Sequence, residues 1–363
     1  MHPQRTTRVR ISDVAAKAGV SKSTVSIAFN NPERLSAETA ARIRVVADEL
    51  GYRPHPVARM LAERRTSTLG ILTPQALVVA FANPFFSMFS QGVASVAEEF
   101  GYGLLFVSPL HGSLARAAGR ASVDGFVAIG LGEDHPEVEQ IRSAGLPIVL
   151  VDSAAFPEHG SITVDDEAGA FAAAEHLLDL GHTEFLVLAV EPPQFARGDG
   201  VESPILDGVM ARRLRGYRRA METRGLGLTE ERVAIGPASF DGGMAAFNRA
   251  LDTGLHFTAV LAMSDAMAIG AIHAAHERGL AVPGDVSLVG FDNIDEAEHT
   301  HPPLTTVHQP VREKGAEAAR LLLAAVNRRE FGQPEHRLLE TRLVTRGSTA
   351  RLARDRQEVQ API

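Results

Sequence analysis

The sequence of 363 residues contains no cysteine. This absence excludes disulfide bonds, thiolate metal sites and a cysteine nucleophile. No stretch approaches the roughly 18 consecutive apolar residues that a membrane-spanning helix needs. The N-terminal segment MHPQRTTRVRISDV has basic residues but no apolar run behind them, so we expect no secretory signal and a cytoplasmic protein.

The sequence motifs of common enzyme classes are also missing. The chain has no G-x-x-x-x-G-K-[ST], no G-x-S-x-G and no H-E-x-x-H. His299 and His301 stand close together, but two histidines beside a Pro-Pro turn are more typical of a surface turn than of a metal site. We therefore expect neither an enzyme nor a bound metal or cofactor.

Charge is divided unevenly along the chain, although the net charge of −8 hides this division. Residues 1–65 carry 12 basic and 6 acidic side chains, and the remaining residues carry 24 and 38, so the two parts have net charges of +6 and −14. A basic head on an acidic body indicates that the head meets a polyanion. The alternative is a solvated basic tail.

The basic head reads as a series of short capped helices. Ser12, Ser21 and Ser36 each stand at the N-cap position of a helical pattern, and Gly19 and Gly51 stand where helices end. The predicted helices cover residues 13–18, 22–30 and 37–50. Two prolines then delay a fourth helix until Val57, and its one or two turns are marginal alone in water.

The first two of these helices, with a glycine in the turn between them, form a helix-turn-helix pattern. The second helix should bury Val25 and Phe29, which are i, i+4 neighbours. Its other face carries Lys22, Ser23, Ser26, Ile27 and Asn30. Ammonium, hydroxyl and amide groups on one face suit phosphate oxygens and base edges in the major groove of DNA. The alternative is a small helical bundle with a polar surface.

From Thr68 onward, short apolar runs alternate with helical stretches, as in TLGILTP, GLLFVSP, DGFVAIG, LPIVLVD, FLVLAV, TAVLAM and DVSLVGFD. Such alternation predicts βαβ units and parallel sheets covered on both faces. The strands are too many for one compact sheet. The predicted fold class is therefore α/β, with two doubly wound subdomains and a ligand cleft at the carboxyl ends of the strands.

The segment ISDVAAKAGVSKSTVSIAFN resembles the signature of the lactose-repressor/galactose-repressor (LacI/GalR) family of bacterial transcription regulators. The resemblance continues through RIRVVADELGYRPHPVARMLA and returns in DVSLVGFD and PPLTTVHQP. It implies a helix-turn-helix head and hinge helix at residues 1–66, a periplasmic-binding-protein-like ligand-binding and dimerisation body at 67–350, and a tail at 351–363. The tail shows no leucine heptad, so the resemblance supports a homodimer and not a tetramer.

The resemblance further implies that two heads bind a pseudo-palindromic operator and that the hinge helix pushes Leu61 into the minor groove at its centre. Many relatives carry arginine where this chain has Ile27. An isoleucine cannot select guanine by hydrogen bonding, but it can pack on a thymine methyl group. The alternative is that Ile27 folds back and contacts no base. The residues expected at the DNA are Arg10, Ser21, Lys22, Ser23, Thr24, Ser26, Ile27, Asn30, Ser36, Tyr52, His55, Arg59 and Leu61.

The same resemblance places a small polar effector, such as a sugar, in the cleft of the body. Carboxylates and a forked guanidinium suit vicinal hydroxyl groups. The expected effector-binding residues are Asn83, Phe85, Phe86, Asp152, Arg213, Phe240, Ser264, Asp265 and Asp292. Other interpretations stay open: Asp152 and Asp292 as turn residues, Phe86 as core, Arg213 at the surface, and Phe240 outside the site.

We therefore expect a cytoplasmic, ligand-responsive transcriptional regulator, most simply a repressor of a sugar or related operon. The alternative is a solute-binding protein, or an enzyme on the same fold, without a DNA function. The basic head and the missing secretory signal argue against both.

Overall fold

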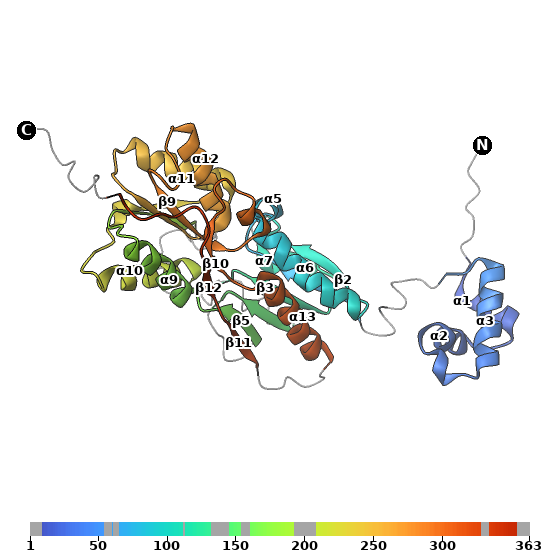
Figure 1. Ribbon diagram of the computed structural model, residues 1–363. Coiled ribbons are helices and arrows are strands. Elements are labelled where there is room, and N and C mark those ends of the chain that lie inside the picture. The colour runs from blue at the N-terminus through green and yellow to red at the C-terminus, as the bar shows by residue number, and fades with distance from the viewer. Residues whose placement is uncertain are drawn as a thin grey trace, which may run out of the picture. The chain divides into compact units, whose positions relative to one another are not determined.

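The structure is a computed structural model, and it describes residues 9–53, 60, 65–111, 113–131, 145–153, 160–191, 208–327 and 334–353 (Figure 1). Contacts between residues divide the chain into two units, Met1–Thr66 and Ser67–Ile363. We call these units the head and the body. No helix among the described residues is long and apolar enough to cross a membrane.

The head consists of three helices around one small hydrophobic core. Its elements are α1 (Ile11–Ala18), α2 (Lys22–Asn30), the 3-10 turn η1 (Pro32–Arg34) and α3 (Ala37–Leu50). Val14, Val25, Ala28 and Ile43 are fully buried where the three helices meet. The edge of Phe29 packs against Tyr52, with 5.8 Å between ring centroids.

Two of the three predicted helix starts are confirmed. The hydroxyls of Ser21 and Ser36 accept the backbone N–H of the residue three positions later, and Gly51 ends α3 with a left-handed φ of 67°. The prediction for Ser12 is wrong. Helix α1 begins two residues earlier, at Ile11, because the Asp13 carboxylate accepts the Arg10 backbone N–H at 2.9 Å and closes the first turn there. The predicted hinge turns, with His55, Arg59 and Leu61, lie outside the described residues.

The first sheet of the body is parallel throughout and has the strand order β11-β5-β4-β3-β1-β2. Helices α6 and α13 pack together on one of its faces, and α7 packs on the other. The strands are β1 (Thr68–Leu72), β2 (Gly103–Val107), β3 (Gly125–Ile129), β4 (Ile148–Val151), β5 (Gly160–Val164) and β11 (His336–Leu339); the helices are α5 (Leu77–Phe81), α6 (Pro84–Glu99), α7 (Leu114–Arg120) and α13 (Val311–Asn327).

The second sheet has the order β12-β10-β9-β8-β6-β7 and is parallel except for β12. Helices α9 and α10 cover one face, and α11 and α12 cover the other (Figure 1). The strands are β6 (Phe185–Val190), β7 (Val233–Gly236), β8 (Ala259–Ala262), β9 (Ser287–Asp292), β10 (Thr305–His308) and β12 (Arg342–Val344); the helices are α9 (Asp166–Asp179), α10 (Val209–Glu222), α11 (Phe240–Asp252) and α12 (Asp265–Glu277), with 3-10 turns η3 (Glu230–Arg232) and η4 (Asp295–Glu298).

The chain crosses between the two sheets three times. The crossings join β5 to α9, β10 to α13, and β11 to β12, so each sheet contains strands from distant parts of the sequence. The predicted fold class, two doubly wound α/β subdomains, is confirmed. Asp152 follows β4 of the first sheet and Asp292 ends β9 of the second, and both lie at carboxyl ends of strands.

A glycine sets the close approach of α9 and α10. A Cβ atom on Gly216 would lie 2.3 Å from the carbonyl oxygen of Glu167, a distance that no side chain tolerates. The two helices therefore touch through their backbones at this point. This contact holds the first turn of α10, with Arg212 and Arg213, against the first turn of α9.

Candidate DNA interface and effector cleft

Helix α2 presents the polar face that the sequence predicts. Lys22 and Ser23 are exposed, and Ser26, Ile27 and Asn30 are half-buried. The Asn30 amide donates a hydrogen bond to Ser26 at 3.3 Å, and both side chains keep further groups for DNA. This face is suited to the major groove, because its groups match phosphates and base edges.

Ile27 stands on this face without joining the core of the head. The half-buried apolar residues that pack against that core include Val20, Phe29 and Leu35, and among the described residues Ile27 is not one of them. The side chain therefore has apolar surface left for another contact. A contact of Ile27 with DNA remains a prediction.

The other described residues expected at the DNA have local roles in the head. Ser36 caps α3, and the exposed Arg10 stands before the first turn of α1. Ser21 caps α2 and lies 2.8 Å from the Thr24 hydroxyl. Tyr52 is buried at 8% exposure, and its ring packs against Phe29 in the core of the head. Their contacts with DNA remain predictions.

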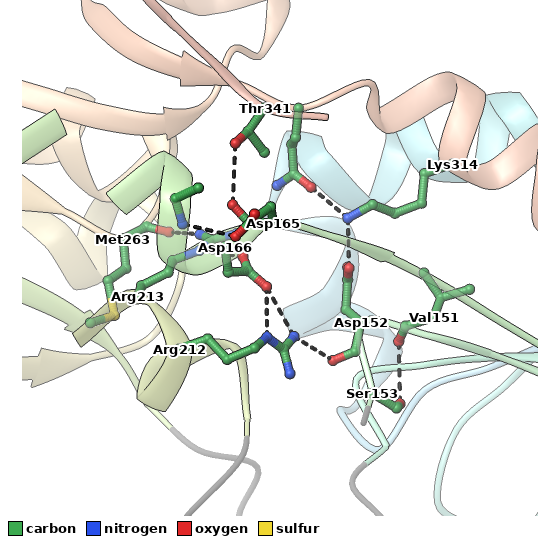
Figure 2. A network of polar contacts seen from close by, with 12 residues as sticks. Val151, Asp152, Ser153, Asp165, Asp166, Arg212, Arg213, Met263, Lys314 and Thr341 are labelled. Carbon is green, nitrogen blue, oxygen red and sulfur yellow. Dashed lines mark hydrogen bonds and ion pairs between the residues drawn. The ribbon is translucent and has the colours of Figure 1, made fainter. Parts of the chain in front are cut away.

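In the body, a buried carboxylate joins two arginines of α10. Asp166, at the first residue of α9, accepts hydrogen bonds from Arg213 Nε at 2.9 Å and from Arg212 Nε at 3.0 Å. A second nitrogen of Arg212 donates to the main-chain oxygen of Asp152 at 3.2 Å. Figure 2 shows these contacts converging from α9, α10 and the end of β4. Arg212 thus links the second subdomain to the first.

Arg213 is held on all sides by the second subdomain. Its guanidinium lies 3.5 Å from the ring centroid of Phe291, donates to the carbonyl oxygen of Met263, and stands 3.9 Å from Asp292. Burial acts to lower the pKa of Arg213, but the two carboxylates outweigh it and the pKa is raised. The interpretation of Arg213 as a surface residue is therefore wrong, because its side chain is buried among these groups.

A second chain of contacts runs from Asp292 back to the first subdomain. The Gln309 amide donates to Asp292 at 2.6 Å, and the Lys314 ammonium donates to Asp152 at 2.6 Å and to Gln309. Gln309 lies in the crossing between β10 and α13. The six charged side chains Asp152, Asp166, Arg212, Arg213, Asp292 and Lys314 are the cleft network; Figure 2 shows most of it.

Burial changes the proton affinity of the carboxyls in this region. Burial raises the pKa of Asp292 to about 8, although Arg213, Gln309 and Lys314 act to lower it. Burial also raises the pKa of Asp265 to about 6, against hydrogen bonds from Thr306 and the Ile294 N–H. Burial therefore makes Asp292 harder to ionise than a carboxyl in water, and the other two carboxylates of the network lie within 3.0 Å of cationic nitrogens.

The predicted wall of the first subdomain is formed in part. Phe85 is half-buried, and its ring centroid lies 5.5 Å from the Lys314 ammonium. Asn83 caps α6, accepting the Phe85 N–H at 3.0 Å. Phe86 is buried and packs against Phe81 and Phe106, with centroid distances of 5.1 and 6.0 Å. Phe85 therefore lies with the cleft network, and Phe86 with the core.

Ser264 and Asp265 anchor helix α12 in the structure. The Ser264 hydroxyl caps α12, and both residues are buried. Asp265 accepts hydrogen bonds from the Thr306 hydroxyl at 2.5 Å and from the Ile294 N–H at 2.9 Å. Both carboxylate oxygens are thus used within the second subdomain. Binding of an effector by these two residues remains a prediction.

Phe240 lines a different cavity, of about 820 Å³, between α11, α12 and η4. Four histidines also line this cavity: His273, His276, His299 and His301. No group of three or more His, Cys, Asp or Glu side chains that could hold a metal occurs in the part of the chain that the structure describes. In contrast to this cavity, the cleft network has charged groups that converge from both subdomains.

Four residues of the cleft network and its surroundings were missed from the sequence. Asp166 is the second residue after β5, whereas Asp152 directly follows β4, so a similar end-of-strand signal could have found it. Arg212 adjoins Arg213, and Gln309 belongs to the PPLTTVHQP segment that carries the family resemblance. Lys314 has no such signal, because a lysine in VREKGAEAAR is typical of an exposed helix face.

Comparisons with known proteins agree with this architecture. Residues 10–55 match the model of the bacterial regulatory proteins of the lacI family, and residues 174–349 match a periplasmic binding protein-like domain. The HTH-type transcriptional regulator CelR of Thermobifida fusca is 32% identical over 352 residues, which are 95% of this chain and 99% of that protein.

Solved structures of similar proteins cover both the head and the body. The lac repressor dimer bound to operator and the anti-inducer ONPF aligns with a TM-score of 0.77 and 27% identity, over 95% of this chain and 100% of that one. The complex of the regulator CelR with cellobiose aligns with a TM-score of 0.68 and 30% identity, over 94% and 100% of the two chains. The chain therefore belongs to the lacI family of DNA-binding bacterial transcriptional regulators.

Proposed function

We propose that the protein is a cytoplasmic homodimeric repressor that binds a pseudo-palindromic operator through α2 of each head and responds to a small polar effector in the cleft of the body. The observation that carries the proposal is the cleft network. It joins the two subdomains through buried and half-buried charged side chains. Two of these, Asp152 and Asp292, lie at the carboxyl ends of strands, where ligands bind in doubly wound folds.

The proposed switch is a shift between two arrangements of the body. An effector that hydrogen-bonds to Arg213 and Asp292 on one subdomain and to Asp152 on the other changes the relative stability of those arrangements. The resulting change in operator affinity depends on the difference between the effector's affinities for the two arrangements. The lac repressor structure with operator and anti-inducer, and the CelR structure with cellobiose, support this proposal by likeness.

Binding of the purified full-length protein to genomic DNA fragments tests the proposal. We expect affinity for a few fragments to fall steeply as salt rises, because the basic head displaces counterions from phosphates. A thermal-shift screen of sugars and sugar derivatives should find compounds that stabilise the body and change DNA binding. Equal affinity for all sequences, or affinity independent of salt, would contradict the DNA-binding function.

Ile27→Arg should change which operator the protein prefers. Arginine donates two hydrogen bonds to guanine O6 and N7, so the variant should gain a guanine preference of about 1–3 kcal/mol at one position of each half-site. Selection from randomised half-sites, with wild type and variant in parallel, measures this preference. The position under Ile27 in the wild-type site should be an A·T pair whose thymine methyl contacts the isoleucine.

The matched control for this experiment is Val45→Arg on α3, because Val45 is 57% exposed and lies on another helix of the head. It should leave the selected half-site unchanged. If the wild type already requires guanine under Ile27, or if Ile27→Arg selects the same site as wild type, then Ile27 does not read the groove.

A further inference from the structure

An exposed ion pair joins the two subdomains of the body. Arg312, in the first turn of α13, belongs to the first subdomain, because α13 packs on β3, β4, β5 and α6. Asp295 begins η4, which follows β9 of the second subdomain. Two nitrogens of the guanidinium donate to the two carboxylate oxygens, at 3.1 and 2.6 Å. By contrast, the exposed pair of Arg320 with Glu317 lies within α13 alone.

A third contact of Arg312 is with the helix beside it. Its Nε donates to the side-chain oxygen of Gln91 on α6 at 3.1 Å, so one guanidinium contacts both subdomains. The main chain of Arg312 is also held against α6. A Cβ atom on Gly92 would lie 1.9 Å from the Arg312 carbonyl oxygen, and one on Gly315 would lie 2.2 Å from that of Phe89. The side chain of Arg312 therefore starts from a fixed position in the first subdomain and contacts the second.

Arg312 lies on the side of α13 away from the cleft network. Lys314, two residues later, contacts that network, and its ammonium lies 2.6 Å from Asp152. Two residues of an α-helix are separated by about 200° around its axis, so Arg312 faces the opposite way. Arg312 is also the second residue of α13, at the end of the crossing from β10. The ion pair therefore spans the two subdomains beside a crossing that any rotation of one against the other must bend.

The pair is specific in geometry but modest in energy. A forked guanidinium and a carboxylate form two parallel hydrogen bonds in one relative orientation. The hydrogen bond from Arg312 also lowers the pKa of Asp295, which keeps the carboxylate ionised at neutral pH. The two side chains are 45% and 66% exposed, and pairs of this kind contribute little to the stability of a fold. A small contribution is enough to shift an equilibrium between two arrangements of similar free energy.

We infer that Arg312 is a positioning residue: its pair with Asp295 holds the two subdomains in the arrangement of this structure, and breaking the pair shifts the body toward its other arrangement. The inference rests on the proposed function, since it names a residue that sets the equilibrium on which the effector acts. Arg312 acts without touching the effector, because its side chain faces away from the cleft network. It changes the response by changing the population of the arrangement that effector and operator meet.

The test measures the distance between the subdomains in the full-length protein without any effector. Because the chain has no cysteine, Glu98→Cys on α6 and Glu222→Cys on α10 provide two unique exposed positions for spin labels, one in each subdomain. Labelled subunits are diluted with unlabelled ones, so that pulsed dipolar electron paramagnetic resonance reports distances within one subunit. Arg312→Gln should raise the ratio of the second distance to the first by roughly twofold to fivefold, the effect expected from the loss of one exposed pair.

A charge swap separates the ion pair from other effects of substitution. Arg312→Glu alone and Asp295→Arg alone should each enlarge the population at the second distance. The double variant should return it toward the wild-type value, because opposite charges again face each other across the subdomains. Arg320→Gln is the matched control, since it removes an exposed pair within α13, and it should leave the distances unchanged.

The outcomes separate this inference from the proposed function. If Arg312→Gln gives the same distances as the wild type and Arg320→Gln, the pair does not set the arrangement and the inference is wrong, while the DNA-binding function stands. A double variant that departs from the wild type as far as the two single variants combined would also refute a role of the pair. Equal affinity of the wild type for all DNA sequences would contradict the proposed function, and the distances would still decide whether Arg312 sets the arrangement.

Discussion

Arg213→Ala should abolish the response of DNA binding to the effector while leaving operator binding itself intact. The guanidinium lies between Asp166 and Asp292 within the body, whereas the residues expected to contact the operator belong to the head and hinge. Removing one partner of a buried charged hydrogen bond costs about 2–5 kcal/mol, which weakens effector affinity by about 30-fold or more. Gel shifts with and without effector, and isotherms of effector binding, measure the two parts.

Arg213→Ala should destabilise the fold less than the loss of a buried charge usually does. Asp166 keeps two contacts with Arg212, at 2.9 and 3.0 Å, and Asp292 keeps the hydrogen bond from the Gln309 amide at 2.6 Å. Arg215→Ala, an exposed position on the same helix, is the matched control and should retain the full response. Normal effector affinity in Arg213→Ala would show that Arg213 has a structural role only.

Asp166→Ala should lower the free energy of unfolding of the body by about 3–5 kcal/mol, because it leaves two arginines without their shared buried carboxylate. Asp166 is 1% exposed and Arg213 is 5% exposed, so solvent has little access to replace the lost partner. Urea unfolding of the full-length protein, followed by circular dichroism, measures the change in the transition of the body. The variant should also respond poorly to effector, since Arg213 loses its orientation.

The neighbouring residue provides the control. Glu167→Ala removes ion pairs to Arg215 and Arg219 on the same two helices, but these side chains are 32–53% exposed. Surface pairs of this kind contribute about 0–1 kcal/mol. A loss of stability that is equal in the two variants would mean that the buried position of Asp166 confers no special stability, and would contradict the account of the cleft network given above.

Several features of this protein were determined by local sequence alone. Serine N-caps set the starts of α2 and α3, a glycine sets the end of α3, and apolar runs alternating with helices set the class of the body, because these signals depend on neighbours along the chain. The positions of Asp152 and Asp292 at strand ends were also predictable from the sequence, since parallel strands bring their carboxyl ends to one edge of a sheet. The outward face of α2 followed from helical periodicity in the same way.

Tertiary structure decided the chemistry of the cleft. Asp166 meets Arg213 across 47 positions of sequence only because Gly216 lets α10 touch α9, and Lys314 meets Asp152 across 162 positions only because the chain crosses between the sheets. A helical sequence pattern predicts that a lysine within it is exposed, and its burial depends on which helix packs against it. Local propensity carries no information about such contacts, because long-range packing and the charges brought together by it determine whether a polar side chain is a surface group or part of a site.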